Sequence, residues 1–157
     1  MGFKNGVYDF AANQFREGRP DDYITLSTNN AYYPENIIKK SEFIKTEIID
    51  FMKQLFPDPA LCEYMWEHMS SVLIGINHNQ TFNIYTGGGS NGKSKLVDLM
   101  SMLLGDYKGV VPASLLTQKR MDIGKASPEI FQLIGRRYAV IQEPSKGDTI
   151  NEGTMKE

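Results

Sequence analysis

The sequence predicts an α/β fold in which helices flank a largely parallel sheet, preceded by a smaller and mostly helical region. Between residues 79 and 157, runs with helical apolar spacing alternate with short apolar runs that resemble strands, a pattern typical of parallel sheets. A glycine-rich loop in this half joins one strand-like run to a helix. Residues 1–78 lack this alternation, so we expect an accessory region at 1–78 and an α/β core at 79–157.

The beginning of the accessory region is rich in Asn, Asp, Tyr and Gly and shows little periodicity. Two short runs, Val7–Phe10 and Tyr23–Leu26, contain residues typical of strands, and the turn-prone stretch Arg16–Asp22 separates them. We therefore expect two short strands here.

Two amphipathic helices are expected in the rest of the accessory region. The first runs from Ser41, a candidate N-cap, to Phe56, and the second begins at Asp58 and Pro59 and ends near Asn77. Their apolar residues recur at helical spacing and are expected to face the core: Ile44, Ile48, Phe51, Met52, Leu55, Leu61, Met65, Met69, Val72, Leu73 and Ile76. Two further residues of the second helix, Cys62 and Trp66, are expected in the core with them.

The glycine-rich loop has the pattern G-x-x-x-x-G-K-S and follows the strand-like run 81–86. Its residues are Gly87, Gly88, Gly89, Ser90, Asn91, Gly92, Lys93 and Ser94. Glycines let backbone N–H groups converge on phosphate oxygens, and the start of the helix expected at 95–104 adds a partial positive charge. Lys93 is placed to reach the β- and γ-phosphates, and the Ser94 hydroxyl is placed to bind Mg²⁺. The loop predicts binding of a nucleoside triphosphate, ATP, with Mg²⁺.

Two features of this loop have a second interpretation. The whole segment also fits a glycine-rich hairpin followed by an ordinary helix. The amide of Asn91 is suited to orient a phosphate or a water near the γ-position, but asparagine also tolerates the backbone geometry of tight loops. The sequence favours neither role of Asn91.

A second motif lies further along the chain, where the apolar run Tyr138–Ile141 is followed by Gln142 and Glu143. A short apolar strand that ends in an acid has the form of a Walker B strand, whose carboxylate holds Mg²⁺ or activates the attacking water. Glu143 is therefore the candidate catalytic and metal-site carboxylate, and Lys93 is the other candidate catalytic residue. The first position of the usual acidic pair is the uncharged Gln142. The alternative is that Glu143 is a surface residue at the end of a strand.

Other elements complete the expected core. Gly105 is placed to end the helix after the loop, and Val110–Pro112 is a strand candidate. A short helix is expected from Ser127 to Ile134. A loose basic cluster precedes it, which fits a solvated face or a contact to phosphate or DNA: Lys119, Arg120 and Lys125.

Composition limits the class of protein. The chain has 157 residues, 41% of them hydrophobic and 23% charged, with a net charge of −2 and one cysteine. These are globular values, and they exclude an internal disulfide and a globally basic nucleic-acid-binding surface. The beginning of the chain is no secretory signal, and no apolar run is long enough to span a bilayer. His68 and His78 are too isolated for a metal site and are expected at the surface or at helix ends.

With these residues in hand, the chain resembles the superfamily 3 helicases, and more narrowly the primase–helicases of large DNA viruses of the poxvirus and giant-virus type. The segments that carry the resemblance are Asn5–Asp9, Asp21–Tyr23, Thr86–Ser94, Leu104–Tyr107, Gly135–Arg137, Gln142–Pro144 and Ile150–Glu157. They extend over essentially the whole chain.

The resemblance implies a three-layer P-loop NTPase core of the AAA+ type behind a helical accessory domain. It implies a homo-hexameric ring that hydrolyses ATP and moves single-stranded or forked DNA through its pore during viral DNA replication. Lys93 and Ser94 would bind the triphosphate and Mg²⁺, and Glu143 would be the Walker B acid. An intracellular location is implied, in the host cytoplasm or at a viral replication site, without contact to a membrane.

The resemblance also implies that the chain is the beginning of the ATPase region. Lys156 and Glu157 resemble the start of the next family motif, and the pore loop, the sensor residue and the arginine finger are expected downstream, with a primase domain upstream. The core would then be incomplete at its C-terminus and inactive alone. Two other readings stay open: a P-loop enzyme of another kind, such as a small-molecule kinase, and a non-catalytic interaction fragment.

Overall fold

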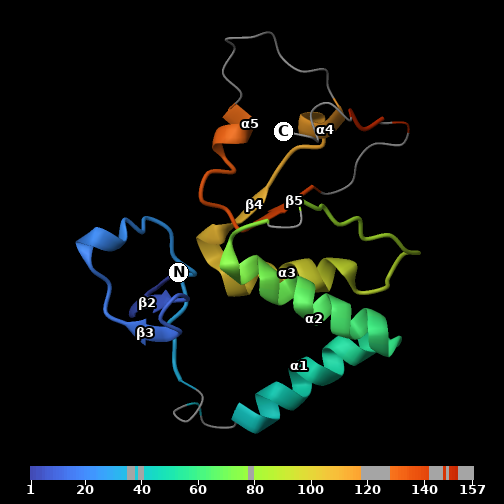
Figure 1. The fold of residues 1–157 in the computed structure, drawn as a ribbon. Coiled ribbons are helices and arrows are strands. Elements are labelled where there is room, and N and C mark those ends of the chain that lie inside the picture. The colour runs from blue at the N-terminus through green and yellow to red at the C-terminus, as the bar shows by residue number, and fades with distance from the viewer. Residues whose placement is uncertain are drawn as a thin grey trace.

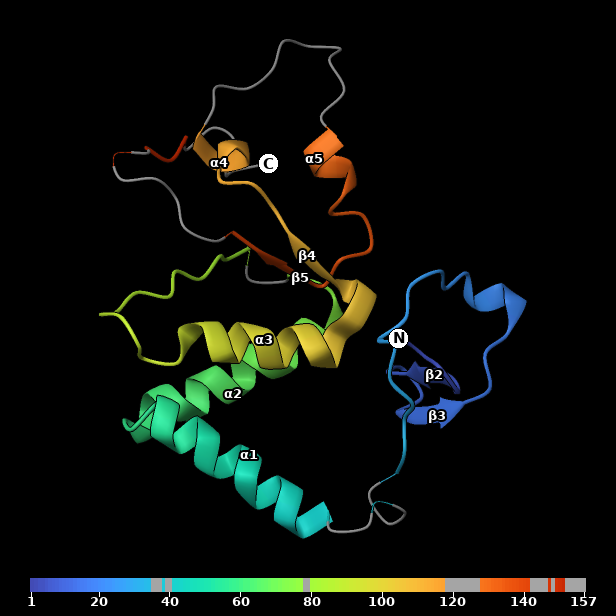
Figure 2. The ribbon, with the colours of Figure 1, turned by 180° about the vertical axis from the view of Figure 1, so that it is seen from behind.

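The computed structural model describes residues 1–34, 38, 41–77, 80–117, 128–141, 147 and 149–151 (Figure 1). Its elements in chain order are β1 (Gly2–Phe3), β2 (Gly6–Asp9), β3 (Gln14–Arg16), η1 (Pro20–Asp22), α1 (Ser41–Leu55), α2 (Pro59–Ile74), α3 (Lys93–Leu104), η3 (Gly105–Tyr107), β4 (Lys108–Val110), α4 (Ser114–Thr117), α5 (Pro128–Phe131) and β5 (Tyr138–Val140). Strands β1 to β3 form a small sheet beside one end of α3, while β4 and β5 lie near α3 on another side (Figures 1 and 2).

The N-terminal sheet is antiparallel, with the order β1-β2-β3 and Val7 opposite Arg16. The expected strand at Val7–Phe10 is confirmed in part, since β2 covers Gly6–Asp9. The expected strand at Tyr23–Leu26 is wrong. Tyr23 has a left-handed backbone with φ of 48°, which an extended strand does not allow.

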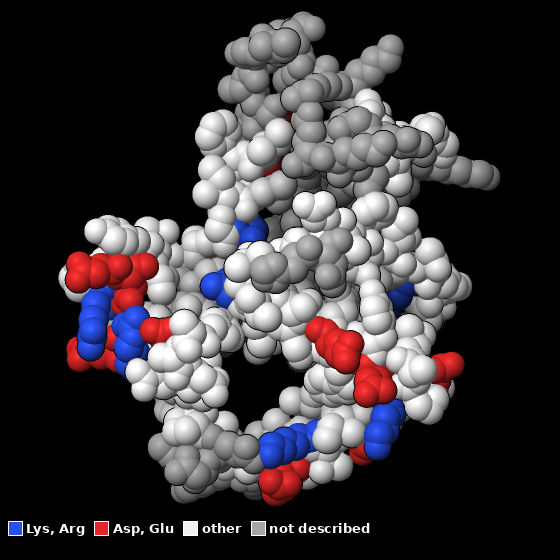
Figure 3. Space-filling view, viewed as in Figure 1, with Lys and Arg blue, Asp and Glu red and all other residues white. Residues whose placement is uncertain are grey.

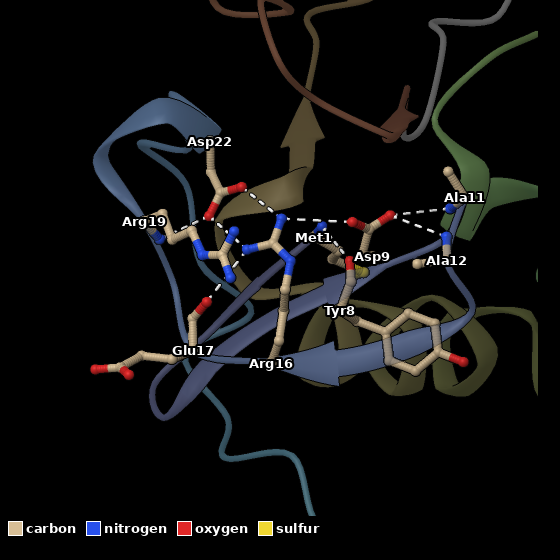
Figure 4. Close-up of polar contacts among 9 residues, drawn as sticks. All are labelled: Met1, Tyr8, Asp9, Ala11, Ala12, Arg16, Glu17, Arg19 and Asp22. Carbon is tan, nitrogen blue, oxygen red and sulfur yellow. Dashed lines mark hydrogen bonds and ion pairs between the residues drawn. The ribbon is translucent and has the colours of Figure 1, made fainter.

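One arginine ties the last strand of this sheet to the turn that follows (Figure 4). The guanidinium of Arg16 donates to both carboxylate oxygens of Asp22, at 2.6 and 2.9 Å, and contacts Asp9 at 3.4 Å. Asp22 also accepts from the backbone N–H of Arg19 at 2.7 Å, and Asp9 accepts from two backbone N–H groups in its own turn. The Arg16 hydrogen bonds hold the pKa of the Asp22 carboxyl well below its usual range.

We expect the Arg16 pair to give the chain a measurable dependence on acid. Because the pKa of Asp22 is lowered in the folded state, its contribution to stability is present above about pH 4 and is lost as the pH falls further. Replacing Arg16 by Met should remove the largest part of that contribution, so the melting temperature of the variant should fall less steeply between pH 5 and pH 2.5 than that of the wild type. Lys95→Met, which removes an exposed cation 3.8 Å from Asp98, is the matched control. Parallel curves for wild type and Arg16→Met would contradict the prediction.

Helices α1 and α2 form where the periodicity predicts them. Asp58 caps α2 by accepting from the N–H groups of Ala60 and Leu61 at 2.8 and 3.0 Å, and Gly75 ends it with φ of 77°. α1 extends away from α3, and an opening separates it from the N-terminal sheet (Figures 1 and 3). No helix within the described ranges is long and apolar enough to cross a bilayer.

The core joins α1, α2, α3, η3 and β5 through buried apolar side chains. Its members are Met1, Met52, Cys62, Met65, Met69, Leu96, Met100, Leu104, Tyr107 and Tyr138. The predicted core positions of α1 and α2 are thus confirmed only in part. Five of the predicted core residues are exposed: Ile44, Ile48, Leu61, Trp66 and Ile76. Ile76 lies beyond the end of α2, and the other four are on helix faces that remain exposed.

The α/β half contains one parallel pair, in which Lys108 of β4 is opposite Tyr138 of β5. This pair confirms the expected strand before Gln142, and β4 begins two residues earlier than the predicted Val110–Pro112. The strand expected at 81–86 is wrong for the described chain: these residues pair with no described strand. The three-layer P-loop NTPase core therefore stays a prediction. The expected helix at 127–134 is shorter, because α5 is followed by turns up to Gly135.

The end of α3 is joined to the N-terminal segment by the run Leu104–Tyr107. Asp106 accepts from Ser27 N at 3.1 Å and from the Asn29 amide at 2.8 Å. The Tyr107 hydroxyl accepts from Gly2 N at 2.7 Å and donates to Leu26 O at 2.8 Å. This run therefore holds the first strand and the segment at 26–29 together against the core.

Arg137 connects three parts of the chain at the same junction. Its guanidinium donates to the Leu73 carbonyl at the end of α2 and lies over the rings of Tyr107 and Phe10, at 5.1 and 5.7 Å from their centroids. Its backbone N–H donates to Tyr107 O at 2.7 Å. Burial lowers the pKa of this guanidinium, and Gly75 leaves room for it, since a Cβ there would lie 3.1 Å from Nε.

Candidate phosphate-binding site

The glycine-rich loop turns sharply into α3, as its sequence predicts. Gly87 and Gly92 have φ of 154° and 81°, which favours glycine, and Ser90 adopts a left-handed φ of 59°. α3 begins at Lys93, and the N–H of Leu96 donates to Gly92 O at 3.1 Å. Leu96 and Val97 are buried, so the helical side of the loop is anchored in the core.

The Lys93 side chain contacts the first residue of the loop and Asn91 within it. Its Nζ donates to Asn91 Oδ1 at 2.7 Å and to Gly87 O at 3.4 Å. The Asn91 amide lies so close to Gly87 that a Cβ at that position would overlap it. Asn91 itself has no positive φ, whereas Ser90 does. Tolerance of a left-handed backbone therefore does not explain Asn91, whose side chain is placed against the lysine.

The loop has the features that a phosphate group requires. Gly92 is the N-cap of α3 and makes no side-chain cap hydrogen bond, which leaves N–H groups of the first turn for an anion. No described atom lies within 4 Å of where a Cβ of Gly88 or Gly89 would be, so backbone and phosphate can approach closely there. Ser94, the predicted Mg²⁺ ligand, follows Lys93 in the first turn of α3 and is exposed.

The second half of the predicted site is described only up to its strand. β5 and Ile141 lead toward Gln142 and Glu143, both of which lie outside the described residues, as do Lys119, Arg120, Lys125 and His78. The distance from Glu143 to Ser94 is therefore untested, and its role as the catalytic and metal-site acid stays a prediction.

A side-chain network on α2 holds the segment that precedes the loop. Tyr64 donates to Asn83 Oδ1 at 3.0 Å, and the Asn83 amide lies 3.3 Å from His68 Nδ1. His68 Nε2 lies 2.9 Å from the Tyr85 hydroxyl, and Tyr85 bonds in turn to Tyr138 of β5. Burial raises the pKa of both tyrosines in this last pair and lowers that of His68.

This network corrects the expectation for His68 and reveals support that the sequence did not predict. His68 is half-buried in the middle of α2 and is not at a helix end. α1 also contributes, because a Cβ at Gly92 would overlap the side chain of Leu55. One feature of the sequence could have indicated this network: Tyr64 and His68 are four residues apart, so they share one helix face.

The chain therefore contains a candidate phosphate-binding loop that is supported by helices. Comparison with known proteins shows the family to which it belongs. Residues 1–69 match the family model described as D5 N terminal like. The chain is 42% identical over 156 residues, 99% of its length, to a protein of Acanthamoeba polyphaga mimivirus named as a putative helicase. It is 32% identical over 157 residues, again 99% of its length, to a protein of Invertebrate iridescent virus 6 with the same description.

A third relative, from African swine fever virus, is named as a putative primase and is 26% identical over 164 aligned positions, covering 100% of the chain. These matches confirm the resemblance to the primase–helicases of large DNA viruses, and the chain belongs among them. It spans 16% of the length of each of these three relatives.

Proposed function

We propose that this chain binds ATP with Mg²⁺ through the loop Gly87–Ser94. Two observations support the proposal. The Lys93 ammonium lies against Gly87 and Asn91 of the loop, and the loop leads into the N-terminus of α3, which has no side-chain cap. The loop N–H groups and Lys93 would bind the β- and γ-phosphates, and Ser94 would contribute to Mg²⁺ binding. Mg²⁺ would neutralise charge on the phosphates.

We further propose that the longer protein is a replicative DNA helicase of superfamily 3 with an AAA+-type ring. The names of the relatives as helicases and primases support this proposal. In such a ring, Glu143 would orient or deprotonate the water that attacks the γ-phosphorus, and the bond to the ADP oxygen would break. Single-stranded or forked DNA and further copies of the chain would be the partners.

Titration calorimetry of Mg·ATP into the chain tests the first proposal, with AMP as a ligand that lacks the β- and γ-phosphates. We expect measurable binding of ATP and none of AMP, and equal binding of the two would contradict a phosphate-directed site. For the longer protein, turnover that rises on addition of single-stranded DNA supports a helicase. Turnover that rises only with a small phosphoryl acceptor would support a kinase instead.

Asn91 offers a more specific test of the loop. We expect Asn91→Asp to weaken Mg·ATP binding by roughly 5- to 20-fold, because the new carboxylate would pair with Lys93 and repel the phosphates. Asn91→Ala removes the amide without adding charge, and its dissociation constant should stay within about threefold of the wild type. An aspartate variant that binds as well as the alanine variant would show that the side chain points away from the bound phosphates.

A further inference from the structure

The segment 81–86, which leads into the phosphate loop, is held by hydrogen bonds of its side chains and not by backbone pairing with a described strand. After Thr81, the hydrogen bonds that fix this segment within the described chain come from Asn83 and Tyr85, and both reach toward α2. The alternate residues Phe82 and Ile84 point away, with 60% and 65% exposure. The alternation typical of a strand is present, but the inward-facing side chains contact α2 and, through Tyr138, β5, and the backbone pairs with no described strand.

The contacts along this face form a continuous chain from Asn83 through His68 to Tyr85. With the Asn83 amide oriented as in the structure, its N–H₂ group donates to His68 Nδ1, and the tautomer of His68 with its proton on Nε2 donates to the Tyr85 hydroxyl. The Tyr85 hydroxyl also pairs with Tyr138 of β5. A neutral His68 satisfies both neighbours, with one ring nitrogen donating and the other accepting, and its burial favours the neutral form.

The two sides of the loop are therefore fixed by different means. On the α3 side, Lys93 is followed by buried helix residues. On the other side, Tyr85 is two residues before Gly87, and His68 is the residue of α2 that contacts both Asn83 and Tyr85. Loss of His68 would remove its contacts to Asn83 and Tyr85 and so loosen the entry side, while the helical side stays anchored.

We propose that His68 is a positioning residue for nucleotide binding, which fixes the entry to the phosphate loop from the accessory helix α2. This inference rests on the proposed ATP site. It assigns to the helical region a direct part in shaping that site.

The test compares three variants of the full chain by Mg·ATP calorimetry and by hydrogen exchange of the amides at 83–87. His68→Phe keeps an aromatic ring beside Tyr64 and removes both hydrogen bonds, while His68→Gln keeps an N–H near the Nε2 position. Glu67→Gln, at an exposed neighbouring position of α2, is the control. We expect His68→Phe to weaken binding by about three- to tenfold and to speed exchange at 83–87. His68→Gln should restore much of both, and the control should match the wild type.

The outcomes separate this inference from the proposed function. If the wild type binds no Mg·ATP, the ATP site is wrong, and exchange alone then decides whether His68 holds the segment. If the wild type binds and His68→Phe binds equally with unchanged exchange, the inference is wrong. Should His68→Phe fail to fold, Tyr85→Phe removes one hydroxyl from the same contact. It should weaken binding in the same direction, and unchanged binding would overturn the proposal.

Discussion

Replacing Lys93 by alanine is expected to weaken Mg·ATP binding by roughly 30- to 150-fold. A charge-assisted hydrogen bond contributes about 2–3 kcal/mol, and Lys93 is the cation that the loop places between Gly87 and Asn91. The helix itself should be unaffected, because the Lys93 side chain bonds only within the loop among the described residues. Calorimetric titration of Mg·ATP into the variant measures the change.

Lys95→Ala is the matched control for Lys93. Its ammonium is exposed on the same helix, and its contact is to Asp98 at 3.8 Å, so its removal should change affinity by less than about twofold. Equal losses in both variants would indicate a general effect of positive charge. Unchanged binding in Lys93→Ala would mean that the triphosphate does not use this loop.

Replacing Gly105 by alanine is expected to destabilise the chain by about 3 kcal/mol and to lower its melting temperature by roughly 6–12 °C. Gly105 has a left-handed φ of 54°, and an added Cβ would overlap the backbone carbonyl of Thr28. Relief requires the segment at 27–29 to move, which would break its hydrogen bonds to Asp106. Thermal unfolding followed by circular dichroism measures the loss.

A second glycine serves as the control for this prediction. Gly88 lies in open space and lacks the left-handed φ, so Gly88→Ala should unfold within about 1 °C of the wild type. Limited proteolysis adds a local readout, since cleavage within residues 1–34 should be faster in Gly105→Ala only. Equal melting temperatures for the two variants would contradict the close approach at Thr28.

Local patterns predicted much of this structure because their causes are local. The start of α2 follows from Asp58 and Pro59, the turn of the loop from its glycines, and β5 from a short apolar run. The prediction of a strand at 81–86 was wrong. Alternating side chains indicate that a segment has two different faces, but they do not show which other segment pairs with its backbone. Here the face with Asn83 and Tyr85 meets the side chains of α2.

The remaining errors concern contacts between distant segments. Helical spacing identified an apolar stripe on α1, but only packing reveals that Met52 is buried while Ile44 is 44% exposed. Likewise, nothing in the sequence next to the motif residues Asp106 and Tyr107 indicates what they contact. Their partners are near Gly2 and Ser27, and a single sequence does not show which distant residues meet. The loop of the candidate site was predictable from sequence, whereas its support by Leu55 and His68 was not.

The junction around Arg137 has a consequence for how the protein is made. A ribosome releases the first strand long before it has synthesised the residues that secure it: Gly2 is bonded to Tyr107, 105 residues later, and Phe10 lies under the still later Arg137. At about 5–20 residues per second, the N-terminal sheet waits roughly 5–20 s for the first of these partners. The sheet itself pairs locally within residues 2–16, but its attachment to the core is therefore among the later contacts to form during synthesis.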